Sequence, residues 1–104
     1  RQRACSDGAG SRLELTDTGD RITVRLEVHR SPPGHSWRIH FRYKEHNITT
    51  IYHHVFFRDT RVASDDGVFV VQRRIPETFH SDGVDGGAVD RQTGEVCKAS
   101  AWYR

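Results

Sequence analysis

The chain has 104 residues, 16 of them basic and 14 acidic, and a formal net charge of +2. A chain of this length forms one domain around one core. Charges of both signs are interspersed, which excludes the basic stripe of a nucleic-acid-binding surface, and no apolar run approaches the roughly 20 residues of a membrane-spanning helix. We therefore expect a soluble monomer that binds neither nucleic acid nor membranes.

Apolar and polar residues alternate through the first part of the chain, with the period of a strand that buries one face. Three such runs lie at 13–15, 22–28 and 37–43, and turn signals at 17–20 and 31–34 separate them. The prolines of the second signal cannot donate to a strand ladder, so the second run ends before them. The residues predicted to face the core are Leu13, Leu15, Ile22, Val24, Leu26, Val28, Trp37, Ile39, Phe41 and Tyr43.

A fourth strand is predicted over 51–57, and a fifth over 68–75, where Pro76 ends it. Asp-Asp-Gly at 65–67 is the turn signal between them. In the fourth strand the expected inward positions are Ile51, Val55 and Phe57, and the expected outward positions are Tyr52, His54 and Phe56.

The last two strands are predicted at 88–90 and 95–103, as a hairpin around 91–94 in which Gly94 can take a positive φ. No stretch shows helical periodicity, and no linker divides the chain. The expected fold is all-β: an antiparallel two-sheet immunoglobulin-like sandwich of seven or eight strands, formed by residues 1–104 as a single domain.

Two segments carry a resemblance to known proteins. Trp-Arg-Ile-His-Phe-Arg-Tyr at 37–43 resembles the third strand of fibronectin type III domains, and 88–95 resembles the closing hairpin of that fold. The segments 12–20 and 88–97 are also similar to small secreted actinobacterial β-sandwich proteins of unassigned function. The resemblance implies the sandwich and carries no activity with it.

Cys5 and Cys97 stand near the two ends of the chain, and neither has a second cysteine close by that would indicate a zinc or redox motif. We expect a disulfide between them, which in the chain-entropy model stabilises the fold by about 4 to 5 kcal/mol. A disulfide indicates a secreted or extracellular protein. A true immunoglobulin domain has its first cysteine much closer to the tryptophan, and Glu95 occupies the place of its tyrosine corner, so the strand order stays open.

Two long, irregular segments, 44–54 and 76–87, are the candidate binding surface. If successive strands run antiparallel, both lie at the same end of the sandwich, and connections of this length are commonly functional. The alternative is that their apolar residues fold back over the end of the core. The candidate ligand-binding residues are His46, Ile48, Tyr52, His54, Phe79, His80 and Val84.

The seven histidines raise a second hypothesis. A tight turn near Asn47 would place His40 opposite His54, and His46 and His80 lie in the two long segments. Two facing imidazoles make a weak site, since zinc requires three or four converging ligands. We therefore expect no metal and no cofactor, and keep a metal- or pH-responsive module as the alternative.

The sequence shows no catalytic motif. Its serines lack the nucleophile-elbow context, and the pairs Asp65 with Asp66 and Asp82 with Asp85 lie in glycine-flanked stretches where aspartate bonds its own turn. The sequence thus predicts a non-catalytic binding module with a protein ligand. The contrast between regular strands and irregular segments also suits an engineered binder with varied loops, and a third reading is a structural extracellular domain.

Overall fold

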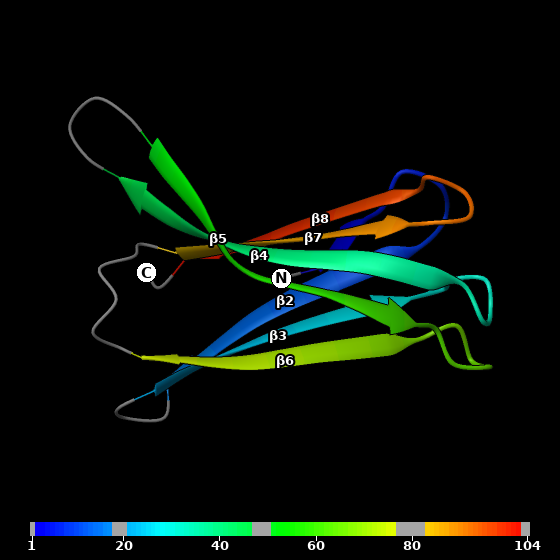
Figure 1. The fold of residues 1–104 in the computed structure, drawn as a ribbon, viewed down its shortest axis with the longest axis horizontal. Coiled ribbons are helices and arrows are strands. Elements are labelled where there is room, and N and C mark those ends of the chain that lie inside the picture. The colour runs from blue at the N-terminus through cyan, green and yellow to red at the C-terminus, as the bar shows by residue number, and fades with distance from the viewer. Residues whose placement is uncertain (1, 18–20, 47–50, 77–82, 103–104) are drawn as a thin grey trace.

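The computed structural model describes residues 2–17, 21–46, 51–76 and 83–102. Within these ranges the chain forms eight strands and no helix, so none that could span a membrane. Two four-stranded antiparallel sheets face each other, the first in the order β1-β2-β3-β6 and the second in the order β5-β4-β7-β8 (Figure 1). The predicted all-β, two-sheet antiparallel sandwich is confirmed. The strands are β1 (Gln2–Ala4), β2 (Gly10–Asp17), β3 (Arg21–His29), β4 (Ser36–His46), β5 (Ile51–Val62), β6 (Phe69–Pro76), β7 (Gly83–Asp90) and β8 (Val96–Trp102).

The strand order differs from that of a constant-type immunoglobulin domain in the place of one strand. In a constant-type domain the fourth strand pairs in the sheet opposite to the third strand. Here β4 takes the place of that third strand, and the strand that follows it, β5, pairs with it along eleven residue pairs, from Ser36↔Val62 to His46↔Ile51. In the sheet β5-β4-β7-β8, β4 and β7 are therefore the central strands. Both of its central strands are covered on each side by a neighbour.

The core follows the predicted alternation. Along β3, buried residues alternate with partly exposed ones over the whole strand. Trp37 and Phe41 are fully buried, and the Trp37 indole donates to Ser31 Oγ at 2.9 Å, which satisfies its polar atom inside the core. Of the ten predicted core residues, Leu15 alone is only partly buried, and it still packs against the core.

The predicted faces of β5 are wrong at two positions. The pairing of β4 with β5 shifts register after Phe41, which pairs with Phe57, while Arg42 pairs with Val55. At this bulge Phe56 has no residue of β4 opposite it. Its side chain turns inward instead, where its ring stacks on that of Tyr43 with centroids 4.0 Å apart. Val55 is 40% exposed in consequence.

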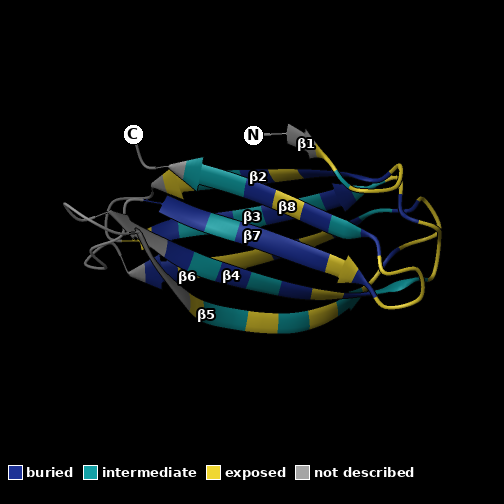
Figure 2. Cartoon of the chain, turned by 90° about the horizontal axis from the view of Figure 1, so that it is seen from above, coloured by how far each residue is buried: buried dark blue, intermediate teal, exposed yellow. Residues whose placement is uncertain are grey.

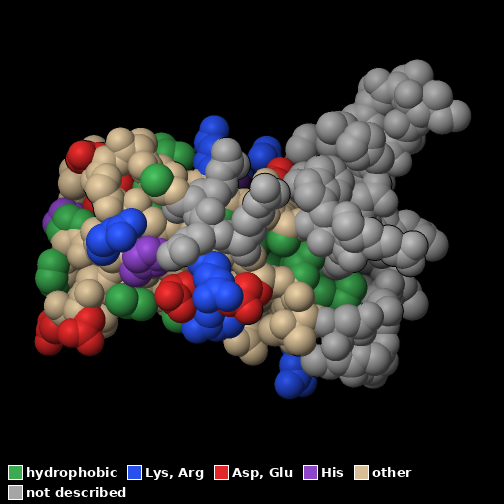
Figure 3. Space-filling view, turned by 180° about the vertical axis from the view of Figure 1, so that it is seen from behind, with side chains coloured by type: hydrophobic (Ala, Val, Ile, Leu, Met, Phe, Trp, Pro, Cys, Tyr) green, Lys and Arg blue, Asp and Glu red, His purple; other side chains and the backbone are tan. Residues whose placement is uncertain are grey.

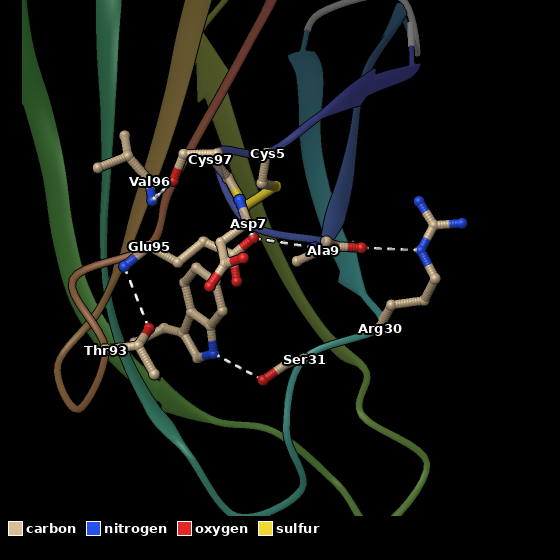
Figure 4. The surroundings of a disulfide bond; sticks show 12 residues. Cys5, Asp7, Ala9, Arg30, Ser31, Thr93, Glu95, Val96 and Cys97 are labelled. Carbon is tan, nitrogen blue, oxygen red and sulfur yellow. Dashed lines mark hydrogen bonds between the residues drawn. A yellow bond between two sulfur atoms is a disulfide. The ribbon is translucent and has the colours of Figure 1, made fainter.

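The predicted disulfide is confirmed: Cys5, just after β1, is bonded to Cys97 in β8, so the bond joins the two sheets. Hydrogen bonds reinforce the same junction (Figure 4). The buried Glu95 carboxylate accepts from the backbone N–H groups of Asp7 at 2.8 Å and Ala9 at 2.9 Å. Glu95, which stands where a tyrosine corner would need tyrosine, therefore ties the segment after β1 to the closing hairpin.

The closing hairpin has the predicted turn, with Gly94 at a φ of +77°. Asp90, at the end of β7, is buried and accepts from His35 Nδ1 at 2.9 Å and from the N–H groups of Gln92 and Thr93. Burial by itself raises the pKa of Asp90, but these hydrogen bonds outweigh it and lower the pKa. The hairpin is thus held by a charged carboxylate.

Strand β7 is longer than predicted. It begins at Gly83 rather than at Ala88, and pairs with β4 on one side and β8 on the other. The glycines at 83, 86 and 87 indicated a loose segment, but both neighbours supply backbone partners that override their weak strand preference. Figure 2 looks down on this sheet and shows β7 buried along most of its length between β4 and β8.

Candidate functional site

The predicted ligand-binding residues fall into three groups. Ile48, Phe79 and His80 lie outside the described residues. His46 lies in β4, and Tyr52 and His54 lie in β5, where the structure describes the backbone alone. Val84 is a correction: it lies in β7 with none of its surface exposed, so it is part of the core and cannot contact a ligand.

The strands that lead into the two long segments end at the same end of the sandwich. Arg21 at the start of β3 pairs with Pro76 at the end of β6, and Lys44 near the end of β4 pairs with Gly83 at the start of β7 (Figure 1, left). At the level of these strand ends, the predicted common end is confirmed. The connecting residues 47–50 and 77–82 lie outside the described chain.

The predicted facing pair of histidines does not form. His40 pairs with Arg58 and His54 pairs with Tyr43, because the two strands pair with His46 opposite Ile51 and not in the register of a tight turn at Asn47. Among the described residues there is no group of three or more metal-ligating side chains. The geometric basis for a His40–His54 metal site is therefore absent.

The described residues do form a groove, on the outer face of the second sheet, with a volume of about 330 Å³. Three rows of paired residues cross β5, β4, β7 and β8 there. The first is Thr60, Arg38, Val89 and Val96; the second is Arg58, His40, Gly87 and Lys98; the third is Val55, Arg42, Asp85 and Ser100. The groove is lined by members of all three rows. Its volume is at the lower end of the range for ligand pockets.

Gly87 shapes the centre of the groove. A Cβ atom at this position would lie 2.2 Å from the nearest atom of the His40 ring, so the imidazole packs directly against the backbone of β7. Any larger residue would push the ring away. Because Gly87 has no side chain, the His40 ring can lie across β7. Lys98 lies on the opposite side of Gly87, on β8.

The third row holds a chain of polar contacts. Ser100 Oγ donates to Asp85 Oδ1 at 2.6 Å, and Arg42 Nη2 lies 3.4 Å from Asp85 Oδ2. Serine, histidine and aspartate all line the groove, but in a hydrolytic triad the imidazole stands between the hydroxyl and the carboxylate. Here the hydroxyl is bonded directly to the carboxylate, an arrangement that positions Asp85 rather than activating Ser100.

The groove has a positive electrostatic character at its centre. Burial first, and then the charges of Arg42 and Arg58, lower the pKa of His40, while Asp85 acts in the opposite direction. The imidazole is therefore neutral at pH 7, in a setting where the neighbouring cations dominate.

Sequence reasoning missed this site. Asp85 was assigned to a glycine-rich turn, whereas it lies in β7 and bonds across to Ser100 and Arg42. Arg42 was predicted to point outward, as it does, but nothing in the sequence placed Lys98 and Ser100 beside it. The available signal was the Gly-Gly pair at 86–87 opposite an alternating Arg-His-Arg strand, which requires the strand pairing to be known.

Comparisons with known proteins identify a fold and no family. The sequence matches no protein-family model and no curated protein. A solved structure, macromomycin, is similar with a TM-score of 0.55 and 11% sequence identity, over 90% of this chain and 99% of that one. At this identity the likeness supports the small two-sheet β-fold alone.

Proposed function

We propose that the protein is a non-catalytic, secreted binding module that recognises a protein ligand. Its binding surface comprises the segments 44–54 and 76–83 together with the outer face of β4, β7 and β8. The disulfide between Cys5 and Cys97 fits an oxidising compartment, and it ties together the framework on which such a surface would be held. We also propose that the resemblance of residues 37–43 to the third strand of fibronectin type III domains reflects a sandwich of that kind.

One observation carries this proposal: the groove lies on the strands β4 and β7, whose ends lead into the two long segments. Its last row contains Arg42 and Asp85, and two residues further along the strands Lys44 pairs with Gly83. Gly83 in turn pairs with Trp102. A ligand that contacts the long segments can therefore reach the groove along the same two strands.

The lack of a catalytic arrangement in the groove supports binding over turnover. Asp85 is engaged by Ser100 and Arg42, and His40 is packed against Gly87. Recognition surfaces of rigid sandwiches use this division of labour, in which strands position and irregular segments contact. The same division suits an engineered binder, for which siblings differing only in the long segments would be diagnostic.

Site-specific photocrosslinking tests the proposal. A photoreactive phenylalanine replaces Ser100 in the groove, Tyr52 in β5, or Gln72 on the outer face of the first sheet as the matched control. Exposed to its native medium, the protein should crosslink to one and the same partner from positions 100 and 52 and not from position 72. Equal crosslinking from all three positions, or none from position 100, would refute the shared surface.

Alanine substitutions separate contact from folding. Tyr52→Ala and Phe79→Ala should abolish capture of the partner found by crosslinking while leaving the melting temperature nearly unchanged. If both substitutions instead unfold the domain, these side chains belong to the core and the long segments do not form the surface.

A further inference from the structure

The outer face of the second sheet carries an unbalanced positive charge. Its basic side chains come from three strands, and the acid that lines the groove among the described side chains, Asp85, already accepts from Ser100 and lies near Arg42. Arg38 and Arg58 are exposed beside His40, and Lys98 is exposed on the opposite side of Gly87. Basic groups that converge on a groove attract an anionic partner.

Arg42 lies in the groove with part of its hydrogen-bonding capacity unused. Its contact with Asp85 is long, at 3.4 Å, and among the described residues its Nε has no acceptor although it is buried. A guanidinium has five N–H donors in a planar fork that matches a carboxylate. A ligand oxygen could therefore engage Arg42 without displacing a strong existing bond.

The neighbours of the charged groups define what else the ligand presents. Val89, 37% exposed, and Val96 form the first row next to Arg38, so the groove has an apolar end and a basic centre. An extended peptide that alternates acidic and aliphatic side chains is complementary to both parts. A small inorganic anion would use the basic centre alone.

We propose that the groove recognises an acidic segment of the protein ligand, with a carboxylate of that segment held between Arg42, His40 and Lys98. This inference rests on the proposed function and adds the chemical class of the ligand. The groups that face His40 are Arg42 on its own strand, Arg58 on β5, Asp85 on β7 and Lys98 on β8. A carboxylate arriving among them offsets the cations, so His40 takes up a proton more readily and binding strengthens as the pH falls from 7 toward 5.5.

Nuclear magnetic resonance of the intact protein tests this class of ligand. The probe is a blocked heptapeptide with alternating glutamate and valine, and its matched control has glutamine in place of every glutamate. The glutamate peptide should shift the resonances of β4, β7 and β8 around the groove and raise the pKa of His40. The glutamine peptide should bind at least about ten-fold more weakly than the glutamate peptide and leave the pKa of His40 unchanged.

Protein variants separate the groove from general charge attraction. Lys98→Gln should lower the affinity for the glutamate peptide several-fold, and Lys98→Glu should lower it about ten-fold or more. Arg74→Glu, an equal change of charge at an exposed position of the first sheet, should leave binding within two-fold at 0.15 M salt, where screening acts over about 8 Å. An equal effect of the two charge reversals would overturn the site.

The remaining outcomes each decide between the two levels of the proposal. If both peptides bind the groove equally, the binding surface stands and the acidic class is wrong. If inorganic phosphate shifts His40 as strongly as the glutamate peptide, the groove is a general anion site and the peptide assignment is overturned. If neither peptide perturbs the groove while photocrosslinking still traps the partner there, the acidic class fails alone.

Discussion

The two outer faces of the sandwich use the same architecture to different ends. On the first sheet, Arg12 pairs with Glu27 and Glu14 pairs with Arg25 across β2 and β3. Within each strand the charges also meet, with 2.9 Å between Arg12 Nε and Glu14 Oε1 and 3.2 Å between Arg25 Nη1 and Glu27 Oε2. Opposite charges therefore alternate in both directions on this face.

On the second sheet the middle row carries two basic residues, Arg58 and Lys98, on either side of His40 and Gly87. Only the third row places an acid, Asp85, beside a basic residue. By contrast, the face seen in Figure 3, from the back of Figure 1, shows basic side chains directly beside acidic ones. The difference teaches that opposite charges on neighbouring strands, as on β2 and β3, satisfy one another, whereas basic side chains around a missing side chain keep interactions available for another molecule.

The disulfide joins the two sheets that carry these faces, and its removal should have the largest effect on stability. Cys5→Ser with Cys97→Ser should lower the free energy of unfolding by about 4 kcal/mol, because the bond closes a loop over 92 positions. Urea denaturation of both proteins measures the loss. A loss below about 1 kcal/mol would mean that Glu95 and its two backbone donors hold the junction by themselves.

The stability of the second sheet also depends on Asp90, at the end of its central strand β7. Asp90→Ala removes the acceptor of three hydrogen bonds and should cost about 3 kcal/mol at pH 7. The folded state lowers the pKa of Asp90, so its stabilising effect is present above about pH 4 and is lost as the pH falls through the lowered value. The difference between the two proteins should therefore shrink in acid.

Denaturation at pH 7 and at pH 3 checks both the size and the sign of this effect. Asp66→Ala, in an exposed turn, serves as the control and should change stability by less than about 0.5 kcal/mol at either pH. A difference that grows in acid would show that the carboxylate is not held in its charged form.

The packing of His40 on Gly87 gives a smaller effect with a change of sign. Gly87→Ala should cost up to about 1 kcal/mol, because the ring must leave its place, 2.2 Å from the new methyl carbon. In the background His40→Ala the same substitution should instead stabilise by about 0.5 kcal/mol, since alanine is preferred to glycine in a strand. A double-mutant cycle measures the coupling. Independent effects would show that the ring does not shape the groove.

The balanced face should give the smallest effect. A double-mutant cycle of Glu14→Gln with Arg25→Gln is expected to show a coupling of about 0.5 kcal/mol, decreasing with salt, because both side chains are partly exposed. A coupling that is absent at low salt would mean that the alternating charges on this face do not set its register.

The sequence was sufficient for the strands whose faces differ in polarity. Ile22, Val24, Leu26 and Val28 are buried as their spacing predicts, because a period of two places alternate side chains on one face whatever the partner strand. The cysteines near the two ends likewise indicated their own bond. Local pattern failed at Phe56 and at Val84, where a bulge and an unexpectedly long β7 decide which way a side chain points.

The candidate site shows the same division. Arg42 and His40 were recognisable as outward residues of one strand, but the groove residues of β7 and β8 that meet them lie more than forty positions away in the chain. The alternation of apolar residues determined the class of fold, the buried faces of most strands and the disulfide that closes the chain. The pairing of strands decided the groove, because the meeting of Arg42, Gly87, Lys98 and Ser100 depends on register between distant segments, which side-chain polarity along one strand does not specify.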